Sequence, residues 1–341
     1  MNHKFIRVYR NVPDLGGKSN NFNIIRIFLA ISVLFSHSFE LLLQPAPVVL
    51  GRTLGNFAVN CFFVISGYFI TKSWIRSDSA FVFIKKRVLR LLPAYIMAFI
   101  LAEILSYIGN GYSICPTPYI KNGSVWTLYY EIMAYLLVMA LGMFGLIKAD
   151  ILGALWAVGL FFCILMYGNS STEYNVLAPL FLNFLGGAYI SQNEKEIRMK
   201  KTGIVCTVIL CVLHFFPRCF WLILQKIPLI YGPACDYISF NYILYLFCLP
   251  FAVVYIGKYL PVVIEIVGDI SYGLYIYAWP IQSIIIYFHF FNRGGVLPEV
   301  LFIEALLITS IISIISYVFI ESKINAKNDS QKFQGMYCNR R

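Results

Sequence analysis

The chain has 341 residues, of which 60% are hydrophobic, 17% are aromatic and only 13% are charged, and its mean hydropathy is +0.74. Soluble globular domains carry about twice that share of charged residues, so the composition excludes them and indicates an integral membrane protein. A net charge of +11 would suit nucleic-acid binding, but the distribution of the basic residues points to membrane topology instead.

Runs of about 20 apolar residues predict transmembrane helices, and the chain contains ten such runs, the seventh being the weakest. The expected helices cover approximately residues 22–43, 54–74, 88–108, 126–147, 151–168, 176–191, 203–217, 237–257, 269–290 and 299–320. The fold class is therefore all-α and polytopic. The first run is too long for a cleavable signal and lacks a small-residue cleavage site, so we expect it to stay in the membrane.

The basic residues are distributed unevenly between the predicted loops. With a cytoplasmic N-terminus, 22 of the 27 Lys and Arg residues fall on the cytoplasmic side. The positive-inside rule therefore predicts that both termini are cytoplasmic. We expect a cytoplasmic segment over residues 1–21, one transmembrane domain over 22–320 and a basic cytoplasmic tail over 321–341, with no internal repeat.

The nine cysteines show no CxxC pair and no spacing typical of a metal site, so no metal is expected. Most of them fall inside apolar runs, where cysteine is a small packing residue. Cys115 and Cys235 would both lie in outer loops, where a disulfide between them remains an alternative to two free thiols.

The first predicted helix carries two ionisable residues that are expensive in lipid unless they are paired or hydrated. Arg26 and His37 are eleven residues apart. That spacing places them within about 20° of one helix face and about 16 Å apart along the axis. They are expected to line one groove at two depths.

Arg87 and Arg90 lie three residues apart at the start of the third helix, on one helix face. Together with Arg26 they would suit phosphate groups, because guanidinium offers planar bidentate donors. The alternative is that basic side chains extend to the lipid headgroups, and this interpretation fits Lys85 and Lys86 better.

Glu131 follows the start of the fourth helix by five residues, about 8 Å below the outer boundary. His37 should lie about 22 Å above the inner boundary of a core about 30 Å thick, so the two depths match. A carboxylate that accepts one imidazole N–H strengthens the other nitrogen as a base. Glu40, three residues after His37, is the alternative partner.

The second helix contains "NCFFVISGYFI", which combines Asn60, Ser66, Gly67 and Tyr68. Small residues of this kind either permit close helix packing or contribute to a ligand site, and the sequence leaves both readings open. No GxSxG elbow surrounds Ser66, so a hydrolase nucleophile is not indicated.

These segments, in this order, resemble the acyltransferase-3 family of bacterial membrane O-acyltransferases in its form without a fused soluble domain. The resemblance rests on the spacing of Arg26 and His37, and on "FFVISGYFI", "KKRVLRLLPAY", "WTLYYEI", "DISYGLYIYAWPIQ" and "FIES". Each piece alone is weak, but their order and spacing together are specific.

The resemblance implies transfer of an acyl group, usually acetyl from acetyl-CoA, to a hydroxyl of a cell-envelope glycan in the bacterial inner membrane. The family's histidine falls on His37, its first-helix arginine on Arg26, its basic pair on Arg87 and Arg90, and its glutamate on Glu131. The sequence departs from the family at three positions. Ala278 stands where many relatives carry histidine, which leaves His37 as the main base. Asn60 stands where aspartate is common, and Lys323, two residues after Glu321, stands where many relatives have proline.

Our hypothesis is that the donor phosphates bind Arg26, Arg87 and Arg90, while His37, oriented by Glu131, deprotonates the acceptor hydroxyl. A two-step route through an acylated His37 is equally allowed. The acceptor is a glycan or a lipid-linked glycan, in contact with membrane lipids and without nucleic acid. The expected substrate-lining residues are Trp126, Ser66, Tyr68 and Asn60. The alternative function is a non-catalytic transporter of a lipid-linked sugar.

Overall fold

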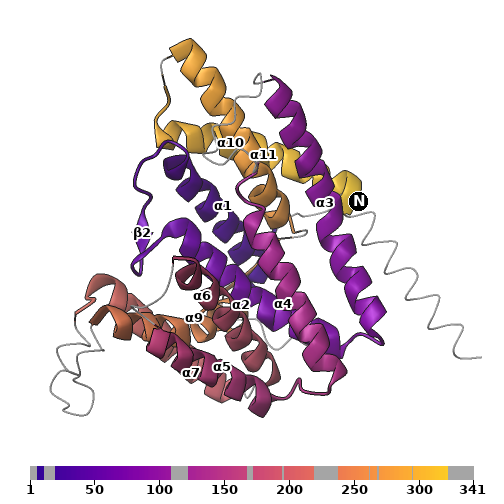
Figure 1. Ribbon diagram of the computed structural model, residues 1–341, viewed down its shortest axis with the longest axis vertical. Coiled ribbons are helices and arrows are strands. Elements are labelled where there is room, and N and C mark those ends of the chain that lie inside the picture. Colours follow the sequence, from indigo (N-terminus) through magenta and orange to yellow (C-terminus); the bar gives the residue numbers. More distant parts are fainter. Residues whose placement is uncertain are drawn as a thin grey trace, which may run out of the picture.

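The computed structural model describes residues 6–10, 20–108, 122–166, 172–193, 196–218, 237–260, 262–266, 269–293 and 295–321. Over these residues the chain is mainly helical (Figure 1). The helices are α1 Phe22–Glu40, α2 Leu54–Ile75, α3 Ala80–Ile108, α4 Trp126–Met143, α5 Ala149–Met166, α6 Thr172–Gln192, α7 Glu196–Phe215, α9 Tyr237–Tyr259, α10 Ser271–Arg293 and α11 Pro298–Ser316, which continues as a π-helical turn, Tyr317–Glu321. Each of the ten predicted helix ranges is thus occupied by a helix.

Within the described residues, six helical segments are long and apolar enough to cross a membrane: α1, α2, α3, α4, Asn241–Tyr259 of α9 and Pro298–Phe319 at α11. A helical segment needs about 20 mostly apolar residues to span the hydrocarbon core. The prediction of a helical, multi-pass membrane protein is therefore supported.

Two features of the fold differ from the sequence prediction. Helix α3 begins at Ala80 rather than near residue 88, so the basic stretch before Pro93 is helical. The prediction failed there because it followed the uncharged window, whereas apolar residues continue at helical spacing between the basic ones. The chain also has two small antiparallel sheets, so it is not strictly all-α. Ile6–Arg10 (β1) pairs with Val262–Ile266 (β4), and Val48–Val49 (β2) pairs with Arg52–Thr53 (β3).

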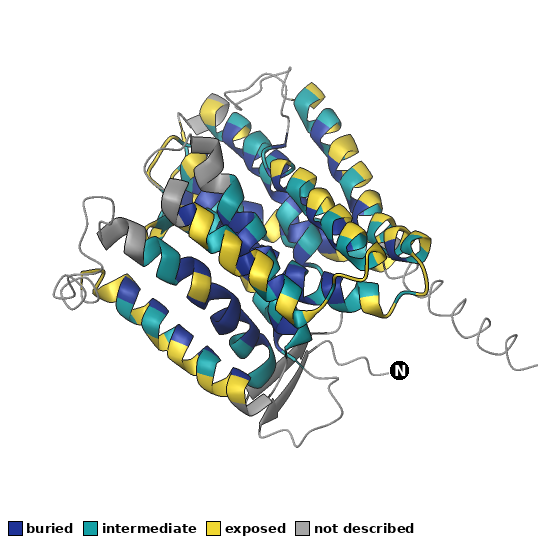
Figure 2. Ribbon diagram, turned by 60° about the horizontal axis from the view of Figure 1, so that its bottom comes forward, coloured by how far each residue is buried: buried dark blue, intermediate teal, exposed yellow. Residues whose placement is uncertain are grey.

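Helices α2 and α6 approach each other closely through glycine. A Cβ atom on Gly67 of α2 would lie 1.9 Å from the carbonyl oxygen of Phe184, and one on Gly187 of α6 would lie 2.1 Å from that of Val64. Small residues let helix backbones approach in this way. Figure 2 shows the consequence, with buried positions on the inward faces of the helices and exposed positions outside.

The packing around α1 fixes one wall of the site described below. Phe22 stacks on Tyr68 of α2 with ring centroids 5.5 Å apart, and its ring occupies the space beside Gly257 of α9. Further along, α1 contacts α10 and α11, where Gln282 donates to the carbonyl of Leu34 and to the Ser38 hydroxyl. Cys115 and Cys235, for which a disulfide is the alternative to free thiols, and Lys323 in the tail lie outside the described residues.

Candidate active site

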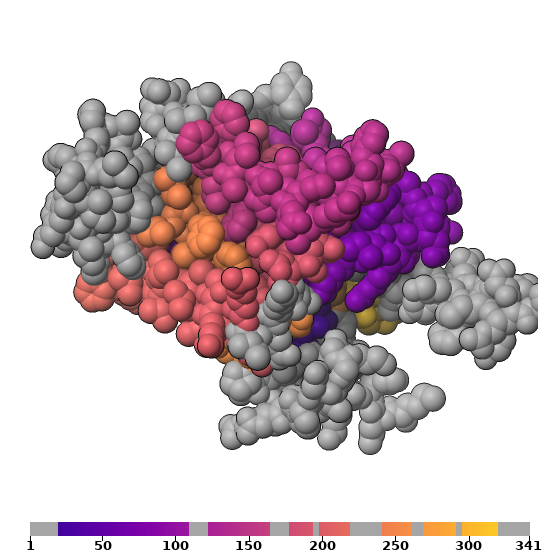
Figure 3. All heavy atoms as spheres, turned by 90° about the horizontal axis from the view of Figure 1, so that it is seen from below, coloured from indigo at the N-terminus to yellow at the C-terminus, as the bar shows by residue number. Residues whose placement is uncertain are grey.

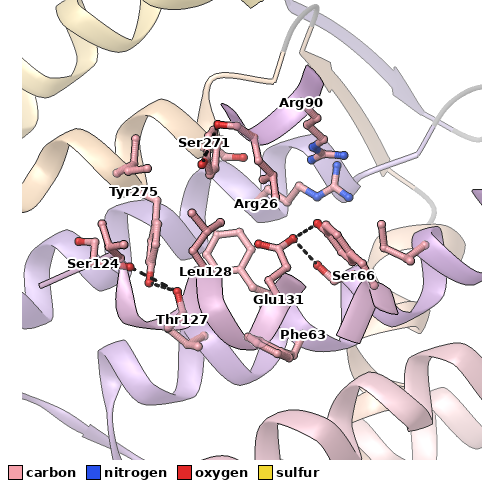
Figure 4. Close-up of a pocket in the computed structure, with 18 of the residues that line it drawn as sticks. Arg26, Phe63, Ser66, Arg90, Ser124, Thr127, Leu128, Glu131, Ser271 and Tyr275 are labelled. Atoms are coloured by element: carbon pink, nitrogen blue, oxygen red, sulfur yellow. Dashed lines mark hydrogen bonds between the residues drawn. The ribbon is translucent and has the colours of Figure 1, made fainter. Parts of the chain in front are cut away.

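A cavity of about 80 Å³ lies between α1, α2, α3, α4 and α10 (Figure 4). Its volume corresponds to a few water molecules, so it can hold reacting groups but not a whole cofactor. Four predicted site residues line it together: Arg26, Ser66, Arg90 and Glu131. The other polar residues in its wall are Ser124, Thr127, Tyr135, Ser271, Tyr272 and Tyr275.

The two arginines meet at one end of this cavity on a shared carboxylate. Asp269 Oδ2 lies 3.3 Å from Arg26 Nη1 and 3.2 Å from Arg90 Nη2, although α1 and α3 are far from residue 269 in sequence. The other carboxylate oxygen accepts hydrogen bonds from the backbone N–H and the hydroxyl of Ser271, at the start of α10. The cluster carries a net charge of +1.

The electrostatics of this end keep Asp269 ionised. Burial alone would raise its pKa, but Arg26 and Arg90, with the hydrogen bonds from Ser271, lower the pKa of Asp269 below its ordinary value. Because the cluster keeps a net positive charge, it attracts a second anion such as a phosphate.

Glu131 presents a carboxylate to the middle of the cavity. Its Oε1 accepts a hydrogen bond from Tyr135, one helical turn further along α4, and a longer one of 3.5 Å from the Ser66 hydroxyl on α2. Figure 4 shows Ser66 pointing at the Glu131 carboxylate. The sequence singled out Glu131, which lines the cavity, but not Tyr135, whose position four residues later was an available signal.

The predicted hydrogen bond between His37 and Glu131 is not present, because each side chain has other neighbours. His37 is buried, its ring packs edge-on against Trp279 of α10 with centroids 4.9 Å apart, and its Nδ1 has no hydrogen-bond partner among the described residues. His37 does not line the cavity. Glu40, the alternative partner, accepts a 2.9 Å hydrogen bond from the Ser36 hydroxyl.

A turn before α4 closes the other end of the cavity against α10. Pro280 has no N–H, which frees the carbonyl of Ile276, and that oxygen accepts a 2.8 Å hydrogen bond from Asn122 Nδ2. Gly123 lies so close to the Trp279 ring that a Cβ there would be 2.6 Å from it. The turn thus packs on the same tryptophan that contacts His37.

The hydroxyl groups at this end complete the polar wall of the cavity. Thr127 and Tyr275 share a 2.6 Å hydrogen bond, and Thr127 also donates to the carbonyl of Ser124 (Figure 4). The Ser124 hydroxyl is fully buried and has no partner among the described residues. Buried unpaired hydroxyls are uncommon and costly, so Ser124 is a free donor available to a ligand.

Arg87 is separated from the other two arginines. Its Nη2 donates to Ser73 Oγ at 2.9 Å, and its guanidinium lies 5.9 Å from the centre of the Phe83 ring. It lines a second hollow, between α3 and α4, rather than the cavity that contains Arg26 and Arg90. Of the three arginines that were expected to form one cluster, Arg26 and Arg90 line the cavity together, and Arg87 lines the neighbouring hollow.

Three of the predicted substrate-lining residues lie elsewhere. Asn60 is fully buried and bonds Asn56 and Asn183, so it joins α2 to α6. The Tyr68 hydroxyl accepts from Lys72 at 2.6 Å, and Trp126 packs on Tyr130. None of the three lines the cavity.

Comparison with known proteins places this arrangement in a family. The family model described as an acyltransferase domain, of the acyltransferase-3 type, matches residues 19–321. The chain belongs to this acyltransferase family.

Two curated members illustrate the relationship. An O-acetyl transferase of Shigella phage Sf6 is 31% identical over 307 residues, which cover 79% of this chain and 86% of the phage protein. Nodulation protein 10 of Rhizobium leguminosarum bv. viciae is 31% identical over 155 residues, which cover 42% of this chain and 41% of that protein. No solved structure matches. This member of the acyltransferase-3 family is therefore an enzyme of the O-acetyltransferase class.

Proposed function

We propose that the enzyme transfers acetyl from acetyl-CoA to a hydroxyl of a cell-envelope polysaccharide or its lipid-linked precursor, in the bacterial inner membrane. The observation that carries this proposal is the cavity with two guanidinium groups at one end and the Glu131 carboxylate in its middle. Transfer of acetyl from acetyl-CoA requires a site that binds the phosphates of the donor and a group that accepts the proton of the acceptor hydroxyl.

In this proposal the phosphates of the donor bind at Arg26 and Arg90, whose cluster with Asp269 carries a net positive charge. The volume of about 80 Å³ holds the acetyl thioester and the acceptor hydroxyl but not the pantetheine arm, so the cavity must widen when the whole donor binds. The buried Ser124 hydroxyl is a donor for the acyl carbonyl oxygen, where negative charge develops during attack.

His37 serves as general base or as transient acyl carrier. In direct transfer, its imidazole takes the hydroxyl proton as the C–O bond forms, the C–S bond breaks, and the CoA thiolate receives a proton from the imidazolium. In the two-step route, the imidazole attacks the thioester, an N–C bond forms as the C–S bond breaks, and CoA leaves as a thiolate that takes the proton of the other imidazole nitrogen. The acceptor hydroxyl then attacks the acetyl-imidazole, the C–O bond forms as the N–C bond breaks, and the released imidazole takes the hydroxyl proton. The His37 Nδ1, which has no partner among the described residues, supports either role. Because the Trp279 ring packs against His37, the indole must shift before His37 meets the substrate.

The proposed topology has ten transmembrane helices and cytoplasmic termini. It is supported by the basic bias of the predicted cytoplasmic segments. It places the arginine end of the cavity toward the cytoplasm, where acetyl-CoA is made, because Arg26 lies in the second turn of α1 and Arg90 in the first half of α3.

The test is mass spectrometry of surface polysaccharide from cells that carry no gene, the wild-type gene, His37→Ala or His289→Ala, at matched protein levels. His289 is a fitting control, because it is also in a helix but bonds Glu304 at 2.8 Å, outside the cavity. We expect an acetyl increment with wild type and His289→Ala only. An unmodified polysaccharide in all four, with altered export, would favour a transporter and reject the proposal.

A further inference from the structure

A groove between α3 and α4 has no role in the function proposed above. Its volume is about 460 Å³, within the usual range for ligand sites. The two helices run in opposite directions along it and contribute side chains turn by turn. The lining is Phe83, Ile84, Arg87, Val88, Leu91, Leu92 and Tyr95 of α3, then Val125, Leu128, Tyr129, Ile132, Tyr135 and Leu136 of α4 and the residue before it.

The groove opens on the outside of the helical bundle. Val88 and Leu92 on α3, and Ile132 and Leu136 on α4, are 44–48% exposed although both helices are apolar enough to cross a membrane. Figure 3 shows the α3 and α4 segments next to each other at the surface, in purple and magenta. In a bilayer this opening faces hydrocarbon, so the occupant that fits the walls is an apolar chain.

Arg87 is the single charged residue among the described residues of the groove wall, and it lies about one helical turn from the Phe83 end. The guanidinium offers five N–H donors. One is used by Ser73, and the buried Nε has no partner among the described residues. A cation with unmet donors near the end of an apolar channel is complementary to an anionic headgroup, and a phosphate matches the guanidinium fork.

The groove and the reaction cavity share a wall. Leu91, Leu128 and Tyr135 line both, and the Tyr135 hydroxyl donates to Glu131 on the cavity side. A group attached to a headgroup at Arg87 is therefore one side chain away from the Glu131 carboxylate. Side chains shared with the reaction cavity distinguish this groove from a surface that only contacts bulk lipid.

We propose that this groove holds the hydrocarbon chain of the acceptor and that Arg87 binds its phosphate, so that the acceptor is a lipid phosphate that carries the sugar. The inference rests on the proposed acetyl transfer and narrows its substrate to the lipid-linked precursor. Arg87 and Arg90 are neighbours on α3, yet each serves a different anion, the acceptor phosphate and the donor phosphates.

The test uses purified full-length protein in lipid nanodiscs with hexadecyl phosphate that carries a diazirine in its chain as the probe. Hexadecanol with the same diazirine tests the phosphate, and unlabelled phosphatidylglycerol tests ordinary lipid binding. We expect crosslinks within residues 83–95 and 125–136, about tenfold weaker labelling with hexadecanol and with Arg87→Gln, and little competition by phosphatidylglycerol.

Matched variants separate the groove from general effects. Lys85→Gln removes the same charge from an exposed side chain two residues away that does not line the groove, and it should label like wild type. Val88→Trp should fill the groove and abolish labelling, whereas Val205→Trp on α7, 56% exposed in wild type, should not.

The inference is overturned if phosphatidylglycerol displaces the probe at equal concentration, if Arg87→Gln labels like Lys85→Gln, or if the crosslinks lie on other helices. These outcomes are independent of the polysaccharide assay. Labelling at the groove without acetylated polysaccharide would reject the proposed function and leave the lipid site standing. Acetylation without labelling at the groove would reject the lipid site alone.

Discussion

Asp269→Asn tests whether Arg26 and Arg90 form the donor's anion site. Asp269 lies 3.2–3.3 Å from both guanidinium groups, so the substitution changes the net charge of the cluster from +1 to +2. Asparagine keeps an oxygen that can accept the N–H of Ser271 at the start of α10. The variant should therefore fold while it attracts anions more strongly.

The magnitude follows from the geometry. A phosphate on the far side of a guanidinium would lie about 7 Å from the Asp269 carboxylate, two hydrogen-bond lengths plus the width of the group. Coulomb repulsion at an effective dielectric constant of about 20 is then about 2.4 kcal/mol per charge. The Arg90 side chain is 41% exposed, so screening reduces this to about 1 kcal/mol. We expect the KM for acetyl-CoA to fall about fivefold.

The assay is initial-rate acetyl transfer at varied acetyl-CoA and two salt concentrations. The decrease in KM should be larger at low salt, because screening weakens the repulsion that the variant removes. Glu299→Gln, at the exposed start of α11, removes one negative charge elsewhere and should leave KM unchanged. An unchanged or higher KM for folded Asp269→Asn would show that the arginine pair does not bind the donor.

The same cluster makes a separate prediction about acid. Because the pKa of Asp269 is lowered in the folded protein, the cluster contributes stability that is fully present above the unfolded pKa, about 4. That contribution is lost as the pH falls through the lower folded value. The unfolding temperature of wild type should therefore drop more steeply below about pH 4 than that of Asp269→Asn.

Three further substitutions, the first with a matched control, test the helix packing around the cavity and one residue of its wall. Gly67→Ala should destabilise the fold by more than about 2 kcal/mol in thermal unfolding, since its Cβ would lie 1.9 Å from a backbone carbonyl oxygen. Gly55→Ala should cost less, because its Cβ would lie 2.9 Å from the Ser36 hydroxyl and 3.0 Å from the Ser36 Cβ. Asn60→Asp should lower the unfolding temperature without changing KM, because Asn60 bonds helices and not substrate; a selective KM change would refute this. Tyr135→Phe should reduce kcat about tenfold at constant KM for acetyl-CoA, by removing a donor to Glu131, and an unchanged kcat would refute that role.

Four of the residues that the sequence singled out, Arg26, Ser66, Arg90 and Glu131, line one cavity. Each was singled out because an ionisable or small polar residue in an apolar helix requires a reason. Depth along the helices did not predict this grouping, because it placed Arg26 and Glu131 at different heights. The helix ranges followed from the length argument, and they began too late where basic residues interrupt a helical pattern, at the starts of α3 and α7.

The predicted pairing of His37 with Glu131 failed because depth fixes the height of a residue but not what fills the space between two helices. Trp279 of α10 packs against His37, and the Glu131 carboxylate accepts a hydrogen bond from Tyr135 instead. Asp269 was missed for a related reason: it precedes α10 as an ordinary helix-capping residue, and only the tertiary fold brings it to Arg26 and Arg90.

The arrangement of the arginines bears on the choice between the two catalytic routes. A carrier on His37 is most useful when donor and acceptor approach from opposite sides of the membrane. The proposed donor site at Arg26 and Arg90 and the proposed acceptor site at Arg87 lie at the same end of α3, on the two sides of a shared wall. With both proposed sites occupied, the two reactants would approach Glu131 from one end, and on that basis we propose direct transfer rather than an acetylated His37.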